Sequence, residues 1–186
     1  MGRDVIRDEE GDILEFDSTT GAIAVQSDIH KMSHQGLAWE VSHIFTGVLS
    51  SASVDMLVVV PSGYEFSGDP QVSSDQDITV EILKVASATP GTAITPNNLK
   101  SLSTNTPQSS FSYTPTGLGA TTQVTGPRFF PASGVGQGAS VFQKLTEIHL
   151  TGESGDALYL FRGTNNSLVA STINLSFLFY EEILSV

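Results

Sequence analysis

Three histidines near the start of the chain, His30, His34 and His43, are the clustered side chains with the clearest potential for chemistry. His30 and His34 are spaced to share one face of either a helix or a strand, so together with Asp28 or His43 they could bind a divalent metal. Two-histidine spacings also arise by chance, and no HExxH-type base lies between these two. We therefore predict no metal and no cofactor, and expect hydrogen bonding at a sheet edge or a subunit contact.

Two further segments contain residues that bind ions in other proteins. Asp69, Asp75 and Asp77 precede an expected strand, but the calcium-binding EF-hand spacing, with its glycine and terminal glutamate, is absent. We expect a solvated acidic loop. The glycine-rich residues 134–138 are not followed by a helix whose N-terminus could hold a phosphate, because residues 139–142 have the composition of a strand. This segment is predicted to be a flexible turn.

Catalysis by a nucleophile or by paired carboxylates has little support. The chain has no Gly-x-Ser-x-Gly elbow and no cysteine. A glycosidase needs two carboxylates about 5 to 10 Å apart, a geometry that sequence alone leaves open. The acids in the expected core region fall where solvent-facing strand or turn residues would lie, and include Glu40, Glu81, Glu147 and Glu153. We predict that the protein is not an enzyme.

Composition and charge limit the possible partners. The 186 residues suffice for one domain, or for one domain with an extended arm. With 20 acidic and 8 basic residues the net charge is -12, which predicts repulsion from nucleic acids and anionic membranes. The longest apolar stretch, residues 56–60, is far shorter than the roughly 20 residues of a membrane span. We expect a soluble protein that is made in the cytoplasm.

Apolar residues that alternate with polar ones predict an all-β fold. Residues 78–85 and 173–180 alternate most clearly, which places their apolar side chains on one face of a strand. We predict an antiparallel, jelly-roll-like β-sandwich from about residue 30 to the end. The expected strands lie around residues 37–48, 54–60, 78–85, 140–150, 157–162 and 168–183. The predicted core contains Trp39, Ile44, Leu57, Val59, Ile82, Phe142, Ile148, Leu160, Leu175 and Phe177.

Two regions differ from this pattern. Residues 1–28 form an acidic arm whose apolar segments 13–16 and 22–25 could pair as a hairpin or add strands to a neighbouring subunit, although a partly disordered tail is an alternative. Residues 29–186 form the sandwich domain. Within it, residues 87–138 are rich in proline, glycine and threonine, and we expect long loops with a few short strands there.

The chain resembles a group of tailed-bacteriophage virion proteins that carry a His-x-x-x-His-x-Gly-x-x-aromatic opening, here residues 30–39. Lys100 stands near where arginine is usual in that group, and Phe179 where tryptophan is usual. The resemblance covers about residues 29–182. Its later segments, in order, are Val58-Val59-Val60-Pro61, Glu81 before Gly91-Thr92, Asn97-Asn98-Leu99-Lys100, residues 158–166 and Phe179-Tyr180-Glu181.

This resemblance implies a capsid decoration, or cement, protein on the exterior of the virion, bound to the major capsid protein and assembled as a homo-oligomer, by analogy a trimer. A carbohydrate- or receptor-binding module of a head or tail fibre is the alternative, for which Trp39, Tyr64, Tyr113 and Tyr159 are the candidate aromatics. The expected capsid or subunit contacts are Asp8, Glu9, Glu10, Ile13, Leu14, Phe16, Ile23, Val25, His30 and His34.

Overall fold

The computed structural model describes residues 15–16, 23–24, 28–131, 143–144, 147–152 and 155–184. Its elements in chain order are β1 (Glu15–Phe16), β2 (Ile23–Ala24), α1 (Asp28–Gln35), β3 (Ala38–Val48), β4 (Ser53–Val60), β5 (Tyr64–Ser74), β6 (Ile78–Val85), β7 (Thr92–Ile94), β8 (Asn97–Asn98), β9 (Ser110–Tyr113), β10 (Thr121–Phe130), β11 (Gln143–Lys144), β12 (Ile148–Thr151), β13 (Ala157–Asn165) and β14 (Ser171–Ile183).

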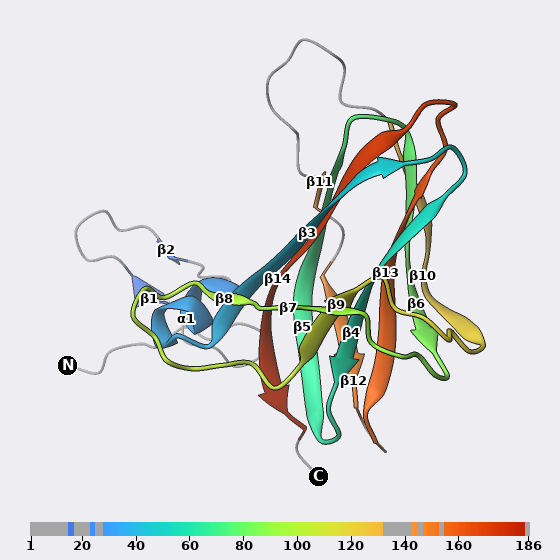
Figure 1. Ribbon diagram of the computed structural model, residues 1–186. Coiled ribbons are helices and arrows are strands. Elements are labelled where there is room, and N and C mark those ends of the chain that lie inside the picture. Colours follow the sequence, from blue (N-terminus) through green and yellow to red (C-terminus); the bar gives the residue numbers. More distant parts are fainter. Residues whose placement is uncertain are drawn as a thin grey trace, which may run out of the picture.

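Two antiparallel sheets pack face to face, as Figure 1 shows. The β14 sheet has the order β11-β5-β14-β3-β8, with β12 also paired to β5, and the β13 sheet has the order β10-β6-β13-β4-β9-β7. The chain crosses between the sheets, and its last two long strands insert between earlier ones: β14 between β3 and β5, and β13 between β4 and β6. This is the strand order of a jelly roll, so the predicted all-β sandwich is confirmed.

Aromatic rings fill the centre of the sandwich. Phe66, Phe161, Phe177 and Phe179 are fully buried, and Phe111 is nearly so. Phe66 stacks on Phe179 with ring centroids 4.8 Å apart, and Phe161 meets Phe177 at 4.8 Å. Offset and edge contacts of this kind add stability beyond the apolar area that they bury. Since these rings come from both sheets, they hold the two layers together.

Strand β5 was not among the predicted strands, because Gly68 and Pro70 lie in its middle. Pro70 pairs with Phe177 of β14 on one side, while on its other side it falls between the residues that pair with β12 and those that pair with β11. Proline lacks the N–H that a ladder hydrogen bond needs and is uncommon within strands, which is why the sequence pattern did not indicate a strand here. Gly68 makes room for aromatic packing, since an added Cβ would meet the Phe66 ring at 2.9 Å and Phe179 at 3.0 Å.

A second apolar cluster lies on the other face of the β13 sheet. It consists of Leu57, Leu83, Val85 and Leu160, with Val59 partly buried beside it. Leu160 stands between Leu57 on β4 and Leu83 on β6 in the strand register. The predicted core residues Leu57, Val59 and Leu160 thus pack on this outer face, whereas Trp39, Ile82, Ile148, Leu175 and Phe177 lie in the main core.

The structure corrects one sequence prediction of burial and one of a strand boundary. Ile44 is 58% exposed, because it is an odd number of residues from Trp39 and so points to the opposite face of β3. The predicted strand at residues 168–183 begins only at Ser171, and Leu168 lies in the preceding loop with 95% of its surface exposed. Phe142 lies outside the described residues.

The region 87–138 combines the expected loops and short strands with one long strand, β10, of ten residues. At the N-terminal end, β1 pairs with β2 through Glu15 with Ala24 and Phe16 with Ile23, as in the hairpin alternative for the arm. Among the described residues, no helix is long and apolar enough to cross a membrane.

We predict that the outer cluster contributes to stability as strongly as a true core. Replacing Leu160 by alanine removes a fully buried side chain and leaves a cavity between β4 and β6, which should lower the free energy of unfolding by about 2 to 5 kcal/mol. The control Ile44→Ala, at an exposed strand position, should cost less than about 1 kcal/mol. Urea denaturation followed by circular dichroism measures both, and equal losses would contradict the assignment.

Candidate functional site: the clamp between α1 and the sandwich

The predicted histidine group does not assemble as a metal site in the described part of the chain. His34 lies exposed on α1, whereas the His43 ring stacks on Tyr113 at a centroid distance of 3.7 Å and meets Phe45 edge-on at 4.6 Å. Burial lowers the pKa of His43, which favours its neutral form. Across the residues that the structure describes, no three His, Asp or Glu side chains gather as ligands. The side chain of His30 lies outside this description.

The acidic candidates are separated by the fold. Asp69 lies inside β5 rather than in a loop and is only 4% exposed, while Asp75 accepts hydrogen bonds from the Ser171 hydroxyl at 3.0 Å and the Thr172 N–H at 2.8 Å. Asp77 accepts the Asn166 N–H through its backbone carbonyl at 2.8 Å. Because these residues have separate structural roles, they do not form the calcium loop that was considered.

The carboxylates considered for glycoside hydrolysis are also dispersed. Glu40 is exposed on β3 of the β14 sheet, and Glu81 stands beside Arg162 on the outer face of the β13 sheet. Glu147 is exposed just before β12, and Glu153 lies outside the described residues. Since Glu40 and Glu81 belong to different sheets of the sandwich, they do not flank a common substrate position.

One constellation that sequence reasoning missed is Ser67, His149 and Glu65. His149 Nδ1 lies 2.7 Å from Glu65 Oε1 and 2.9 Å from the Ser67 hydroxyl. A catalytic triad needs the serine and the acid on opposite ring nitrogens, so that the ring relays a proton. Here both partners share one nitrogen, and Ser67 is fully buried. The group therefore ties β12 to β5 and does not activate a nucleophile. The residues are too distant in sequence for any local pattern to have revealed it.

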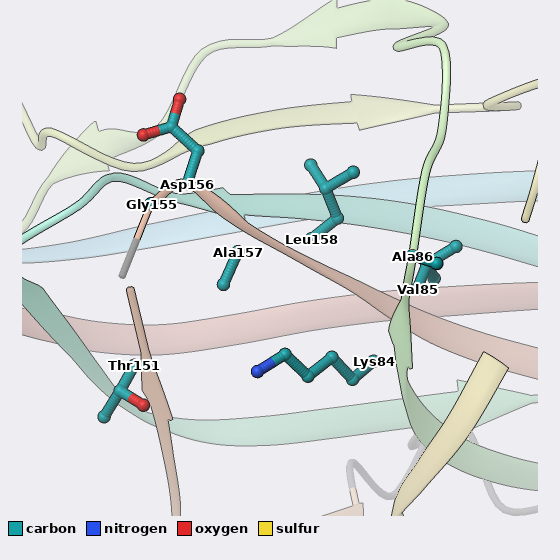
Figure 2. Close-up of a pocket in the computed structure, with 8 residues that line it drawn as sticks. All are labelled: Lys84, Val85, Ala86, Thr151, Gly155, Asp156, Ala157 and Leu158. Carbon is teal, nitrogen blue, oxygen red and sulfur yellow. The ribbon is translucent and has the colours of Figure 1, made fainter. Parts of the chain in front are cut away.

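A pocket of about 300 Å³ lies at one end of the sandwich, between β6, β12 and the start of β13. Figure 2 shows the Lys84 side chain extending into it, with the Asp156 carboxylate turned to the other side. Asp156 instead accepts the Ser62 N–H at 3.1 Å. The Lys84 ammonium lies 5.8 Å from the centre of the Tyr159 ring. Of the lining residues that the structure describes, Lys84 is the cation, and the Asp156 carboxylate is engaged with the Ser62 backbone rather than with Lys84.

A polar network joins the end of α1 to the loop after β8. We call its residues, Gly36, Trp39, Asn98, Ser103 and Asn105, the α1 clamp. The helix ends in a Schellman motif, with Gly36 N–H donating to Ser33 and Leu37 N–H to Met32. The Gly36 carbonyl accepts from the Asn98 amide at 2.9 Å and from the Asn105 amide at 3.1 Å. The Trp39 indole N–H donates to the Asn105 carbonyl at 3.3 Å.

The clamp is continuous with the core and with the last strand. Trp39 stacks on Phe179 at 5.7 Å, and the Glu181 carboxylate accepts the N–H groups of Gln108 and Ser109, each at 2.6 Å. Glu181 thereby fixes the end of the loop that begins at β8. In Figure 1, α1 and β8 lie together beside the N-terminal part of β3, off one end of the sandwich.

The segments that carry the resemblance to phage virion proteins contact one another. Gly36, Trp39, Asn98, Phe179 and Glu181 meet at the clamp or next to it. In the β13 sheet, residues 58–60 of β4 pair with residues 157–159 of β13. Comparisons with protein-family models, curated proteins and solved structures found no match to this chain.

Arg162 links two of these segments. It lies between Asp55 and Glu81 in the strand register and forms a two-pronged ion pair with Asp55, at 2.7 and 3.0 Å. This hydrogen bond raises the pKa of the guanidinium, against the opposing effect of burial. Asp55, Glu81 and Arg162 thus form a cross-strand ionic row next to the outer apolar cluster.

We predict that Gly36 is indispensable to the clamp. Its φ is +74°, and an added Cβ would meet the Ser103 hydroxyl oxygen at 2.6 Å, so Gly36→Ala should lower the free energy of unfolding by at least about 1 kcal/mol. Adding Ser103→Ala should recover part of that loss. In the control Gly126→Ala, the new Cβ meets nothing within 4 Å. Urea denaturation compares the variants, and equal stability of Gly36→Ala and Gly126→Ala would refute the prediction.

Proposed function

We propose that the chain is a non-enzymatic virion structural protein that binds the outside of a tailed-bacteriophage capsid and stabilises it as a decoration protein. Its partners in this proposal are the major capsid protein and further copies of itself, by analogy in a trimer. A shell protein of this kind acts through many repeated contacts, so it needs a rigid scaffold and exposed surfaces rather than reactive side chains.

The observation that carries the proposal is the convergence of the resemblance segments. Short sequence matches that arise by chance have no reason to meet in space. In this chain the histidine-glycine-aromatic opening, the Asn-Asn segment and the closing Phe-Tyr-Glu segment join through Gly36, Asn98, Trp39 and Phe179. Convergence of this kind is what a shared architecture would produce, and it supports a common fold with the phage virion group.

The charge and the reactive groups are compatible with this role. A net charge of -12 suits the exterior of a shell better than its interior, where packaged DNA would repel the protein. In the described part of the chain, the Ser67, His149 and Glu65 group and the Lys84 pocket lack the geometry of a catalytic centre. His149 and Asp75 instead hold strands and loops together through their hydrogen bonds.

The fibre-module alternative is not favoured by the positions of its candidate aromatics. Trp39 and Tyr159 are each 4% exposed, so their faces are not available for stacking on a sugar ring. The Tyr113 ring is covered on one side by His43, and Tyr64 is partly buried against the main core. Binding to a capsid therefore remains the proposal.

We predict that the purified protein binds virions of its phage on the capsid and not on the tail. Virions that lack the gene for this chain should be incubated with the protein and imaged by cryo-electron microscopy. We expect regularly spaced density outside the capsid, with occupancy that saturates as protein is added. Density confined to the tail or its fibres would reject the proposal in favour of the fibre module.

We predict that the acidic arm strengthens this attachment. Deleting residues 1–27 leaves α1 intact and should leave the sandwich folded, but should reduce capsid occupancy, because a short hairpin gains stability by packing on a neighbour. A control that replaces Asp8, Glu9 and Glu10 by their amides should lose mainly the salt-sensitive part of binding. If the truncated protein decorates capsids as fully as the intact chain across a salt series, the arm has no such role.

A further inference from the structure

Three loops meet at one end of the sandwich, and two of them carry exposed apolar side chains. We define the end-loop surface as the loops of residues 49–52, 75–77 and 166–170, which lie at the upper end of the molecule in Figure 1. Leu49 is 70% exposed, Leu168 95% and Val169 54%. The strand pattern alone would have extended β14 over residues 168–170, yet the fold leaves them outside the sheet. Positions where a local rule fails are frequently functional.

A buried asparagine holds two of these loops rigidly together. Asn165 is fully buried, and its side-chain amide donates to the carbonyls of Val48 and Val169, each at 2.8 Å. Its backbone N–H donates to Ala52 at 3.0 Å, and its carbonyl accepts from Ser51 at 2.9 Å. This one residue therefore joins the backbone at Val48, just before Leu49, to the backbone at Val169.

The third loop is attached by a separate set of hydrogen bonds. The Asp75 carboxylate accepts from Ser171 and Thr172, and the Ser167 hydroxyl donates to Gln76 at 3.2 Å. The Asn166 N–H donates to the Asp77 carbonyl at 2.8 Å. Apolar side chains on loops fixed in this way lose little conformational freedom when a partner covers them, so the surface is pre-organised for binding.

Charge indicates which partner would fit. Asp75 is an exposed carboxylate of these three loops, and the loops contain no lysine or arginine. An apolar centre beside a carboxylate complements an apolar depression bordered by basic side chains. If a second copy docked end to end on this surface, carboxylates of the two copies would face and repel each other. An anionic membrane would repel the surface for the same reason.

We infer that the end-loop surface is the face that docks on the capsid, with Leu168 and its neighbours entering an apolar depression rimmed by lysine or arginine on the major capsid protein. This inference rests on the proposed function and assigns it a surface. The acidic arm then adds a second contact from elsewhere on the molecule. In this inference, the exposed apolar side chains and the carboxylate beside them determine which site on the capsid is recognised.

The test is capsid binding of Leu168→Asp, with Ile183→Asp as a matched control. Ile183 is 74% exposed and lies at the other end of β14, roughly 40 Å away at 3.3 Å per residue, so both changes place a carboxylate on an exposed apolar position. Thermal denaturation should show both variants folded like the parent. We expect Leu168→Asp to weaken binding to undecorated capsids by at least about tenfold, because it buries an unpaired charge, and Ile183→Asp to change it less than about twofold.

A salt series and sedimentation complete the design. Replacing Asp75 by asparagine, which keeps its shape, should reduce the salt dependence of binding. If the parent binds capsids and Leu168→Asp binds them as well as Ile183→Asp does, the end-loop surface is not the docking face. The proposed function stands in that case. If the parent does not bind capsids, both proposals fail together. If sedimentation shows that Leu168→Asp dissociates a homo-oligomer that the parent forms, the surface contacts a second copy and the inference is wrong.

Discussion

The ring of Phe179 is the contact on which the rest of the molecule depends. It stacks on Phe66 at 4.8 Å within its own sheet, meets Phe111 of the facing sheet at 5.0 Å and supports Trp39 at 5.7 Å. Gly68 lies against it and has no side chain that would displace it. Through Trp39 the same ring supports the α1 clamp. A single buried aromatic thus joins the two layers of the sandwich and the only helix among the described residues.

The loops around this aromatic core are held by non-covalent contacts. The protein has no cysteine, so its loops are fixed by packing and by side-chain hydrogen bonds to the backbone. Asn98 and Asn105 act at the clamp, and Asn165 acts at the opposite end. An asparagine amide can donate two hydrogen bonds and accept others, so one buried residue can satisfy several loop carbonyls at once. The asparagines that indicated turns in the sequence therefore also form the hydrogen bonds that hold those loops in place.

The sequence was a good guide where one face of a strand is buried and the other is not. β6 and β14 alternate clearly and were predicted, because a two-residue period is a direct consequence of pleating. β5 was missed, since Gly68 and Pro70 normally interrupt strands. Gly68 is tolerated because the neighbouring aromatic rings occupy the space that a side chain would fill. Tertiary context of this kind has no local signature.

The candidate sites were less predictable, since they depend on residues brought together by the fold. Ser67 and His149 lie on neighbouring strands only because β12 pairs with β5, and the geometry that rules out a triad is visible only in three dimensions. Leu168 and Val169 look like strand residues by composition, yet Asn165 bonds to the Val169 carbonyl and ends the strand pattern before β14 begins. The same hydrogen bond that removes them from the sheet exposes them to solvent. At this end of the sandwich, the buried Asn165 therefore also fixes the loop on which Leu168 and Val169 are exposed.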